Sequence, residues 1–395
     1  MVKRISASIA IIVITLLFMT SCMMLDYIFS RSDANRSYNS IPRVDADIDW
    51  ELDVIIEAGG STNFIITSDG SLWGWGENTH GQLGDGTTED RHSPVWIMDD
   101  VTAVSAGHTH TMAIRTDSSL WVWGDNSRGQ LGDGTRTNRL SPIKVMDDIA
   151  YASAGGLHTS VTKTDGSLWA WGAASIDSNE DRLNPMWIMD DVVYISAGGG
   201  HTMAITADDS LWAWGANHSG QIGDGTTEAR LNPVWVMDDV AHVSAGGSHA
   251  TAIKTDGSLW AWGGTGHTVN HSRNFGQVGD GAREPRHNPV WIMDDVAYVS
   301  AGSDHTMAIT TDGTLWGWGI NADGRVGDGS TSIALSPRRI MSDVAVVSVG
   351  FSHTIAIRTD GSLWAWGDNR RGQLGDGTTE NRNNPMQIMD IISLP

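Results

Sequence analysis

Asp69-Gly70-Ser71-Leu72-Trp73-Gly74-Trp75-Gly76 is an aspartate-glycine turn that runs into a strand with two tryptophans one residue apart. An Asp-Gly pair between alternating apolar runs is a strong hairpin signal, because a type I′ turn requires positive φ at both central residues. In the strand, the tryptophans point to one face, and the leucine and the small glycine point to the other. The stretch therefore predicts a β-hairpin that lets neighbouring sheets stack face to face.

The stretch recurs six more times, in copies whose leucines are Leu120, Leu168, Leu211, Leu259, Leu315 and Leu363. From leucine to leucine the steps are 48, 48, 43, 48, 56 and 48 residues, a period typical of propellers and solenoids. The 46 glycines and 10 prolines favour short strands joined by tight turns. We therefore predict one closed all-β body over residues 48–395, with four strands in each unit.

Closure of the ring is expected to matter, because burying two tryptophans does not offset the backbone entropy lost in ordering one unit. The repeats begin with the strand Val54 to Gly59 and finish with the strand Pro385 to Met389. We predict that these N- and C-terminal strands close the ring by completing one shared sheet. In two units Asp117-Ser118 and Asp208-Asp209 replace Asp-Gly, and there we expect looser turns or another turn type.

The N-terminus has the features of an export signal. A basic start precedes an uncharged apolar run from Ile5 to Met19, and Cys22, the only cysteine, follows. Cys22 stands where a bacterial lipoprotein signal places the lipidated cysteine, although Met19 departs from the usual leucine. Residues 1–22 are then a signal peptide or lipoprotein signal, and residues 23–47 a flexible tether. The alternative is an uncleaved transmembrane anchor, Ile5 to Leu25. Both place the repeats outside the cytoplasm, on the bacterial membrane or cell surface.

The repeated pattern resembles that of the regulator of chromosome condensation family. It reads Ala-Gly-x-x-His-Thr, then Thr-Asp-Gly-Ser-Leu-Trp-x-Trp-Gly, then Asn-x-x-Gly-Gln-Leu-Gly-Asp-Gly, then Pro, and it covers about residues 48–395. The resemblance implies a seven-bladed β-propeller. The family includes a nuclear exchange factor for the small GTPase Ran and a secreted bacterial inhibitor of β-lactamases, so the fold alone does not decide function.

Three recurring polar residues are candidates for site chemistry. The Ala-Gly-x-x-His histidines are His110, His158, His201, His249, His305 and His353. Equivalent positions lie far apart around a wide channel, so we expect them to hydrogen-bond the turn of each blade and not to bind metal. The Gly-Asp-Gly aspartates are Asp85, Asp133, Asp224, Asp280, Asp328 and Asp376, and we interpret them as turn residues rather than calcium ligands. The arginines three residues before the proline are Arg91, Arg139, Arg182, Arg230, Arg286 and Arg382. We predict that such an arginine pairs with the Gly-Asp-Gly aspartate of its own blade, except that unit three keeps Arg182 without the motif and unit six keeps Asp328 but has Ala334.

No nucleophile-base signature, phosphate-binding glycine loop or metal-binding cluster is present in the sequence, so we expect no enzyme, no metal and no cofactor. The net charge of -22 argues against nucleic acid or an anionic membrane surface as a partner, because both need a basic patch. We expect a monomer that meets the membrane only through its N-terminal lipid or anchor.

Departures from the repeat are the better indicators of function, because a symmetric ring cannot recognise an asymmetric partner through features common to every blade. Unit five is eight residues longer than the 48-residue period and carries the candidate contacts His267, His271, Arg273 and Phe275. The alternative is a tolerated surface insertion. Tryptophans two places after the proline, at Trp96, Trp187, Trp235 and Trp291, are a second candidate set. They either stack on sugars or anchor a protein, or they pack between blade edges.

The leading hypothesis is a membrane-tethered, extracytoplasmic module that binds an unknown protein through one propeller face. The alternative is binding of cell-wall or other glycan by exposed tryptophans. A third hypothesis, guanine-nucleotide exchange on a small GTPase, rests on family analogy, and the export signal and acidic charge argue against it.

Overall fold

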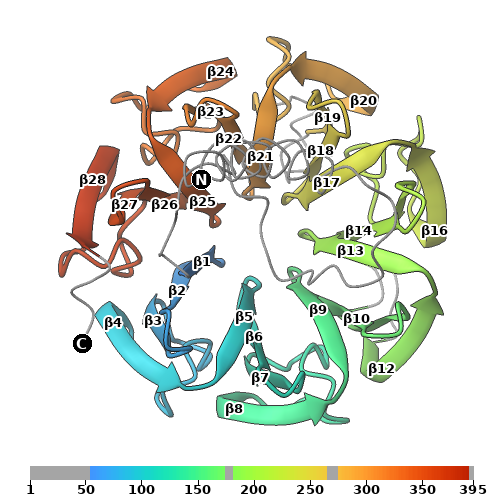
Figure 1. Cartoon of the computed structure of the whole chain (residues 1–395), viewed down its shortest axis with the longest axis vertical. Coiled ribbons are helices and arrows are strands. Elements are labelled where there is room, and N and C mark those ends of the chain that lie inside the picture. The colour runs from blue at the N-terminus through green and yellow to red at the C-terminus, as the bar shows by residue number, and fades with distance from the viewer. Residues whose placement is uncertain (1–53, 174–180, 265–274, 391–395) are drawn as a thin grey trace, which may run out of the picture. The chain divides into compact units, whose positions relative to one another are not determined.

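The computed structural model describes residues 54–173, 181–264 and 275–390, and over these ranges every helix or strand assigned is a β-strand. Seven antiparallel four-stranded sheets follow one another along the chain, each built from four consecutive strands. The sheets stand as blades around a central channel in sequence order (Figure 1). We number the blades 1 to 7, from β1–β4 to β25–β28. The predicted seven-bladed, all-β propeller is confirmed.

Each position within a blade is occupied by equivalent strands. The innermost strands, which surround the channel, are β1 (Ile55–Ala58), β5 (Val101–Ala106), β9 (Ile149–Ala154), β13 (Val192–Ala197), β17 (Val240–Ala245), β21 (Val296–Ala301) and β25 (Val344–Val349). The second strands are β2 (Thr62–Ile66), β6 (His110–Arg115), β10 (His158–Lys163), β14 (His201–Thr206), β18 (His249–Lys254), β22 (His305–Thr310) and β26 (His353–Arg358). The tryptophan strands are β3 (Leu72–Gly76), β7 (Leu120–Gly124), β11 (Leu168–Ala173), β15 (Leu211–Gly215), β19 (Leu259–Gly263), β23 (Leu315–Gly319) and β27 (Ser362–Gly367). The outer strands are β4 (Arg91–Met98), β8 (Arg139–Met146), β12 (Asp181–Met189), β16 (Arg230–Met237), β20 (Arg286–Met293), β24 (Ala334–Met341) and β28 (Arg382–Asp390).

The second tryptophan of each pair packs between two blades. In blade 2, Trp123 is fully buried, and its Nε1–H donates to the backbone oxygen of Gln82 in blade 1 at 2.9 Å. The indole lies against Gly84, where an added Cβ would come within 2.7 Å of Nε1. Phe64 and Leu83 of blade 1 belong to the same apolar cluster as Trp123. Because this core forms between blades, a single unit has no complete core of its own.

The turn between the second and third strands is not the predicted type I′ turn. In blade 1, Gly70 has a φ of 82° whereas Asp69 does not take positive φ. The amide of Gly70 donates to the Thr67 carbonyl at 2.8 Å, and the amide of Thr67 donates to the Ser71 carbonyl at 3.0 Å. This is a type I turn followed by a left-handed residue that forms a G1 bulge. Only the left-handed position needs glycine.

The two units without that glycine keep the same turn, so the expectation of looser turns is wrong. Ser118 and Asp209 take left-handed φ values of 61° and 63°. Their amides donate to the carbonyls of Arg115 and Thr206, both at 2.9 Å, as in the other blades. The hairpin pairing therefore imposes on these side chains a backbone conformation that glycine adopts more easily.

Ring closure also differs from the prediction. Strand β1 belongs to the sheet of blade 1 and β28 to the sheet of blade 7, so no sheet is shared. Instead β1 packs beside β25, as every inner strand packs beside its neighbour. The amide of Ala58 donates to Ser348 Oγ at 2.8 Å, and His353 Nε2 lies 2.8 Å from Asn63 Oδ1. The prediction failed because a periodic sequence does not show which of its strands begins a blade.

The repeated histidines join neighbouring blades rather than capping their own turns. Nε2 of His110 lies 3.0 Å from Thr159 Oγ1 of the next blade, and His249 lies 2.9 Å from Thr306. Burial lowers the pKa of both histidines to about 3. They are therefore neutral at physiological pH and act as structural hydrogen-bonding groups. His201 differs from this pattern, because its buried Nδ1 and Nε2 have no hydrogen-bond partner within the described ranges.

Candidate functional site

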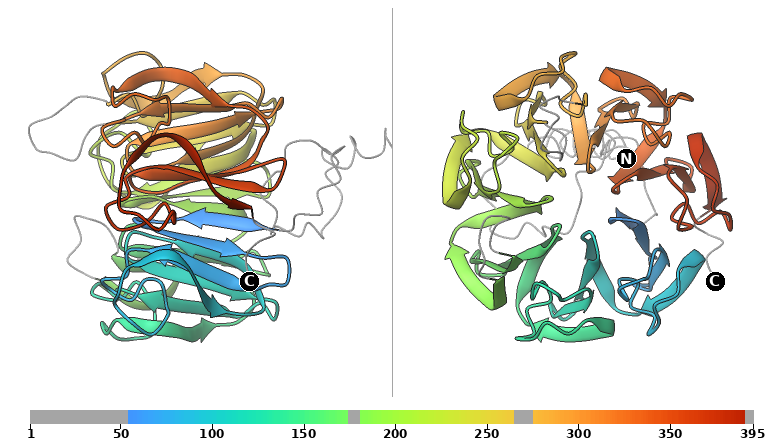
Figure 2. Two further views of the ribbon diagram at one scale, coloured as in Figure 1. Left: turned by 90° about the vertical axis from the view of Figure 1, so that its left-hand side faces the viewer. Right: turned by 180° about the vertical axis from the view of Figure 1, so that it is seen from behind.

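Antiparallel alternation places equivalent connections on the same face of the ring. The β1–β2 and β3–β4 connections of blade 1 lie on one face, and the β2–β3 and β4–β5 turns lie on the opposite face (Figure 2). We call these the loop face and the turn face. The connections whose lengths depart from the repeat run from β11 to β12 and from β19 to β20, so both start and end on the loop face.

Most of the predicted unit-five contacts cannot be placed. His267, His271 and Arg273 lie outside the described residues, as does Cys22. Phe275, the first described residue after the gap, is half-buried, and its amide donates to Gln277 Oε1 at 2.8 Å. These residues therefore stay candidates on the strength of the sequence.

The tryptophans two places after the proline lie on the outer wall of the ring. Trp96, Trp187, Trp235 and Trp291 stand on β4, β12, β16 and β20 with exposed fractions of 52%, 50%, 52% and 53%. Each donates its Nε1–H to an aspartate three residues later, as Trp96 does to Asp99 at 2.9 Å. Each also pairs across the sheet with the first tryptophan of its unit, as Trp96 does with Trp73. About half of each indole is therefore exposed on the outer wall, and the two interpretations, packing at a blade edge or contact with a partner, both stay open.

The predicted arginine-aspartate pairs form in five blades. The distance between the guanidinium nitrogen and the carboxylate oxygen is 2.6 Å for Arg91 and Asp85, 2.5 Å for Arg139 and Asp133, 2.5 Å for Arg230 and Asp224, and 2.9 Å for Arg382 and Asp376. The fifth pair is Arg286 with Asp280. In blade 6, where Ala334 replaces the arginine, Arg338 from the same strand pairs with Asp328 instead. The aspartate also accepts hydrogen bonds within its loop, as Asp133 does from Asn126 Nδ2 at 3.0 Å. This pair is a structural element of the loop face.

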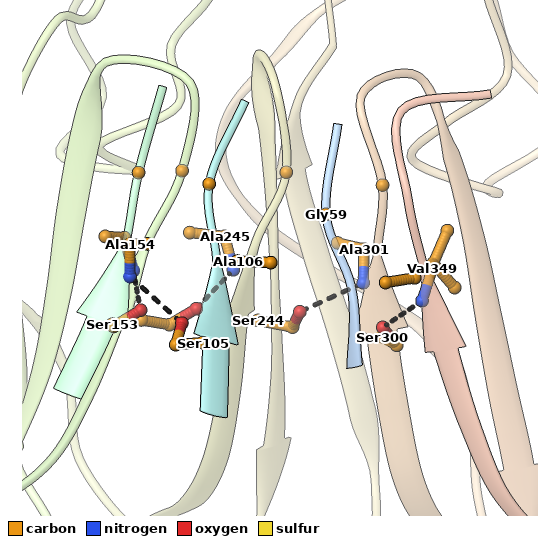
Figure 3. Close-up of a pocket in the computed structure, with 18 of the residues that line it drawn as sticks. Gly59, Ser105, Ala106, Ser153, Ala154, Ser244, Ala245, Ser300, Ala301 and Val349 are labelled. Carbon is orange, nitrogen blue, oxygen red and sulfur yellow. Dashed lines mark hydrogen bonds between the residues drawn. The ribbon is translucent and has the colours of Figure 1, made fainter. Parts of the chain in front are cut away.

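The inner strands are joined by a closed belt of hydrogen bonds around the channel. The residue before the Ala-Gly pair accepts a hydrogen bond from a backbone amide of the next blade (Figure 3). Ser105 Oγ, for example, accepts from the amide of Ala154 at 3.0 Å. The accepting residue is serine in six blades: Ser105, Ser153, Ser196, Ser244, Ser300 and Ser348. The seventh position, in blade 1, is Glu57.

Glu57 is the one charged member of this belt. Its Oε1 accepts from the amide of Ala106 at 3.3 Å, a longer contact than the serines make. Burial raises the pKa of the Glu57 carboxyl to about 7, against hydrogen bonds from Ala106 and Ser348 that lower it. A carboxyl group that titrates near neutral pH in a channel is a candidate functional group.

An arc of four aromatic rings lies on the opposite side of the ring, and its three tyrosines line the channel. The position two residues before the belt serine is Tyr151, Tyr194, His242 and Tyr298 in blades 3 to 6. Their ring centroids follow one another at 4.9, 5.2 and 5.1 Å with tilted planes. The Tyr151 hydroxyl donates to the Tyr194 hydroxyl at 3.3 Å. Burial raises the pKa of all three tyrosines, which therefore stay protonated at neutral pH.

Three exposed side chains break the repeat in the first connections of the loop face, and two of them, His108 and Phe351, border the channel. His108, Leu157 and Phe351 come from the first connections of blades 2, 3 and 7, and Leu157 and Phe351 are 39% and 43% exposed. The rings of His108 and Phe351 meet edge to face, with centroids 5.4 Å apart. We call these three residues the mouth patch.

Sequence reasoning missed Glu57, the aromatic arc and the mouth patch. A signal was present for Glu57 and the mouth patch, because these residues depart from the one most common at their repeat positions. The aromatic arc is marked instead by the contrast with Ile55, Ala103 and Val346, which stand at its position in the other three blades. The predicted contacts were chosen from changes in repeat length and from tryptophans. Single substitutions at an aligned repeat position also make the ring asymmetric, and they are an equally good indicator of a binding site.

The described part of the chain holds no group of three or more histidine, cysteine, aspartate or glutamate side chains placed to bind a metal ion. Within the same ranges, no helix of the length and apolarity needed to cross a membrane is found.

Comparison with known proteins identifies the repeat. The family model of the RCC1-like domain matches residues 175–393. One model of the regulator of chromosome condensation (RCC1) repeat matches residues 69–114 and 117–161. A second model of this repeat matches residues 54–82 and 101–130. No curated protein matches the sequence.

Solved structures share the fold at low identity. Yeast RCC1 (Prp20) bound to Kap60 superposes with a TM-score of 0.71 at 19% identity, covering 92% of this chain and 89% of that one. Human WBSCR16 gives a TM-score of 0.70 at 20% identity, covering 81% of this chain and 94% of that one. A second Saccharomyces cerevisiae Prp20p structure gives 0.71 at 17%, covering 92% and 90%. With its seven blades and its repeat matches from residue 54 to residue 393, this chain belongs to the RCC1-like domain family.

Proposed function

We propose that this chain is a non-enzymatic protein-binding propeller, tethered outside the cytoplasm by its N-terminal lipid or anchor, which contacts its partner through the loop face. The observation that carries this proposal is the mouth patch. Exposed apolar and aromatic side chains at the centre of a face are the usual anchors of protein interfaces, and here they occur where four of the seven blades have glycine at the position of His108 and Phe351.

The structural neighbours support binding of proteins by this fold. Yeast RCC1 (Prp20) was crystallised bound to Kap60, and a second study of Prp20p describes its binding to Gsp1p and histones. Their partners do not transfer to this chain, because identities of 19% and 17% establish the fold alone.

Site-specific photo-crosslinking in cells that produce the full chain tests the loop face. A photoreactive residue replaces Leu157 in the mouth patch, and in matched controls it replaces Ser118 on the turn face or Trp96 on the outer wall. We expect one discrete crosslinked protein from position 157 and none from position 118. Phe351→Gly should reduce that product, since glycine stands there in four blades. Equal products from all three positions would refute a loop-face interface.

The tether is tested separately. A Cys22→Ser variant should lose incorporation of labelled fatty acid and move from the membrane fraction to the soluble extracytoplasmic fraction. If the variant stays in the membrane without the label, the uncleaved anchor is correct and lipidation is not. A chain found in the cytoplasm would contradict both.

A second candidate function is glycan binding, favoured by the four outer indoles that are about half exposed. Their bound Nε1–H groups hold the rings in place, and fixed exposed rings are suited to stacking on sugars. A variant with all four of these tryptophans changed to glutamine, the residue that blade 7 carries at Gln387, is the matched test. Retained binding to purified cell-wall glycan by this variant would exclude the outer wall as the glycan site.

A further inference from the structure

We propose that the central channel binds an organic ammonium group, held between the carboxylate of Glu57 and the tyrosines of the aromatic arc. This inference concerns the channel and does not depend on the protein-binding function proposed for the loop face.

The position of Glu57 in the ring is the first argument. In a ring of seven blades, the point opposite blade 1 lies between blades 4 and 5. The aromatic arc spans blades 3 to 6 and is centred on that same point (Figure 1). Glu57, Tyr151, Tyr194 and Tyr298 line one continuous cavity. The negative charge of Glu57 is also among the causes that raise the pKa of these three tyrosines.

The belt itself does not require a glutamate, which is the second argument. Serine makes the same contact with the next blade at 2.8 to 3.2 Å in the other six positions. Glu57 makes it at 3.3 Å and places an ionisable group where burial disfavours its charge. A costly charge that adds nothing to the belt points to a role in binding.

The chemistry of the walls selects the ligand class. Aromatic faces attract organic cations, and a carboxylate supplies the counter-charge. An inorganic cation needs several oxygen ligands around one centre, whereas among the described residues Glu57 is the one carboxylate lining this cavity. The cavity is open to solvent and is bordered at the loop face by Gly60, Gly156 and Gly199, which carry no side chains that would narrow its entrance. A slender alkylammonium chain therefore has room to enter.

Calorimetric titration of the full chain tests the proposal with pentane-1,5-diamine, and pentane-1,5-diol serves as the neutral control of the same length. We expect the diamine to bind at pH 8 and the diol not to bind. Because a lysine side chain of a partner protein carries the same group, N-acetyl-lysine-N-methylamide forms a third arm. Binding of the diamine alone assigns the site to free amines, and binding of both extends it to lysine side chains.

The variants use residues that the chain already places at equivalent positions, so that folding is preserved. Glu57→Ser copies the other six belt positions, Tyr194→Val copies Val346, and Trp96→Gln on the outer wall copies Gln387 as the control. We expect Glu57→Ser to weaken diamine binding at least tenfold and Tyr194→Val about threefold or more. Trp96→Gln should leave it unchanged.

The pH dependence gives a second readout. The groups that face the Glu57 carboxyl are the Ala106 amide, Ser348 and the three arc tyrosines, and His108 borders the same cavity near the loop face. With a pKa of about 7 for Glu57, diamine affinity should be about thirtyfold weaker at pH 5.5 than at pH 8. The proposal is overturned if the diamine does not bind at pH 8, if the diol binds equally, or if folded Glu57→Ser binds like the wild type.

Discussion

The histidine of blade 4, for which the described part of the chain supplies no hydrogen-bond partner, yields the sharpest stability prediction. In blade 5, Nε2 of His249 lies 2.9 Å from Thr306 Oγ1, and that hydroxyl donates to the Gln277 carbonyl at 2.9 Å. Because the hydroxyl has one hydrogen, it accepts from the Nε2–H of the histidine. In blade 4 the corresponding acceptor for His201 is missing, since Ala250 stands where the other blade has threonine.

Ala250→Thr should restore both hydrogen bonds, one from His201 and one to the Gln221 carbonyl. That carbonyl now accepts from Trp262 Nε1 at 3.0 Å and has a second lone pair. Each hydrogen bond contributes about 0.5 to 1.5 kcal/mol, so after the entropy of ordering the side chain we expect a gain of about 1 to 2 kcal/mol in the free energy of unfolding.

Equilibrium unfolding in guanidinium chloride, followed by tryptophan fluorescence, measures the change. Ala250→Val is the matched control, because it fills nearly the same volume without a hydroxyl, and it should not stabilise. Thr306→Ala performs the reverse experiment in blade 5 and should lower the free energy of unfolding by about 1 to 3 kcal/mol, since it leaves a buried donor unpaired. If Ala250→Thr and Ala250→Val behave alike and Thr306→Ala has no effect, the inter-blade histidine bonds do not stabilise the ring.

Three further predictions concern single positions. Glu57→Ser should stabilise the fold at pH 8 by at most about 3 kcal/mol. Because the pKa of Glu57 is raised in the folded state, the stability of the wild type is highest below the unfolded pKa near 4.5 and is lost as pH rises through about 7. If variant and wild type are equally stable at pH 8 as well as at pH 4, this prediction is wrong. Ser118→Gly should raise the free energy of unfolding by about 0.5 to 1 kcal/mol, and with it the melting temperature, since it relieves a left-handed φ of 61°. A lower melting temperature would show that the turn is not strained. Asp133→Asn should cost about 2 to 3 kcal/mol in chemical unfolding, because it breaks the pair with Arg139. Burial alone would raise the pKa of Asp133, but hydrogen bonds from Thr135, Arg139 and Asn126 lower it, so the wild-type advantage should be complete above about pH 4 and shrink as pH falls through the lowered value; an advantage that does not change with pH would refute this assignment.

The local structure was predictable from the sequence because it depends on near neighbours. Alternation in Leu72-Trp73-Gly74-Trp75 predicts a strand with a small residue opposite a large one, and the period predicts repeated blades. The pairing of Arg91 with Asp85 was likewise predictable, since both residues recur at fixed spacing within one unit.

Ring closure and the channel were decided by the tertiary structure. A periodic sequence is equally compatible with any choice of first strand, so it did not show that β1 and β28 lie in separate sheets. Nor did it show that Glu57 faces Tyr194 and its neighbours, because that opposition depends on the number of blades and on the order in which they close. The repeat determines what each blade is, and closure of seven blades around one axis determines which blades face each other across the channel.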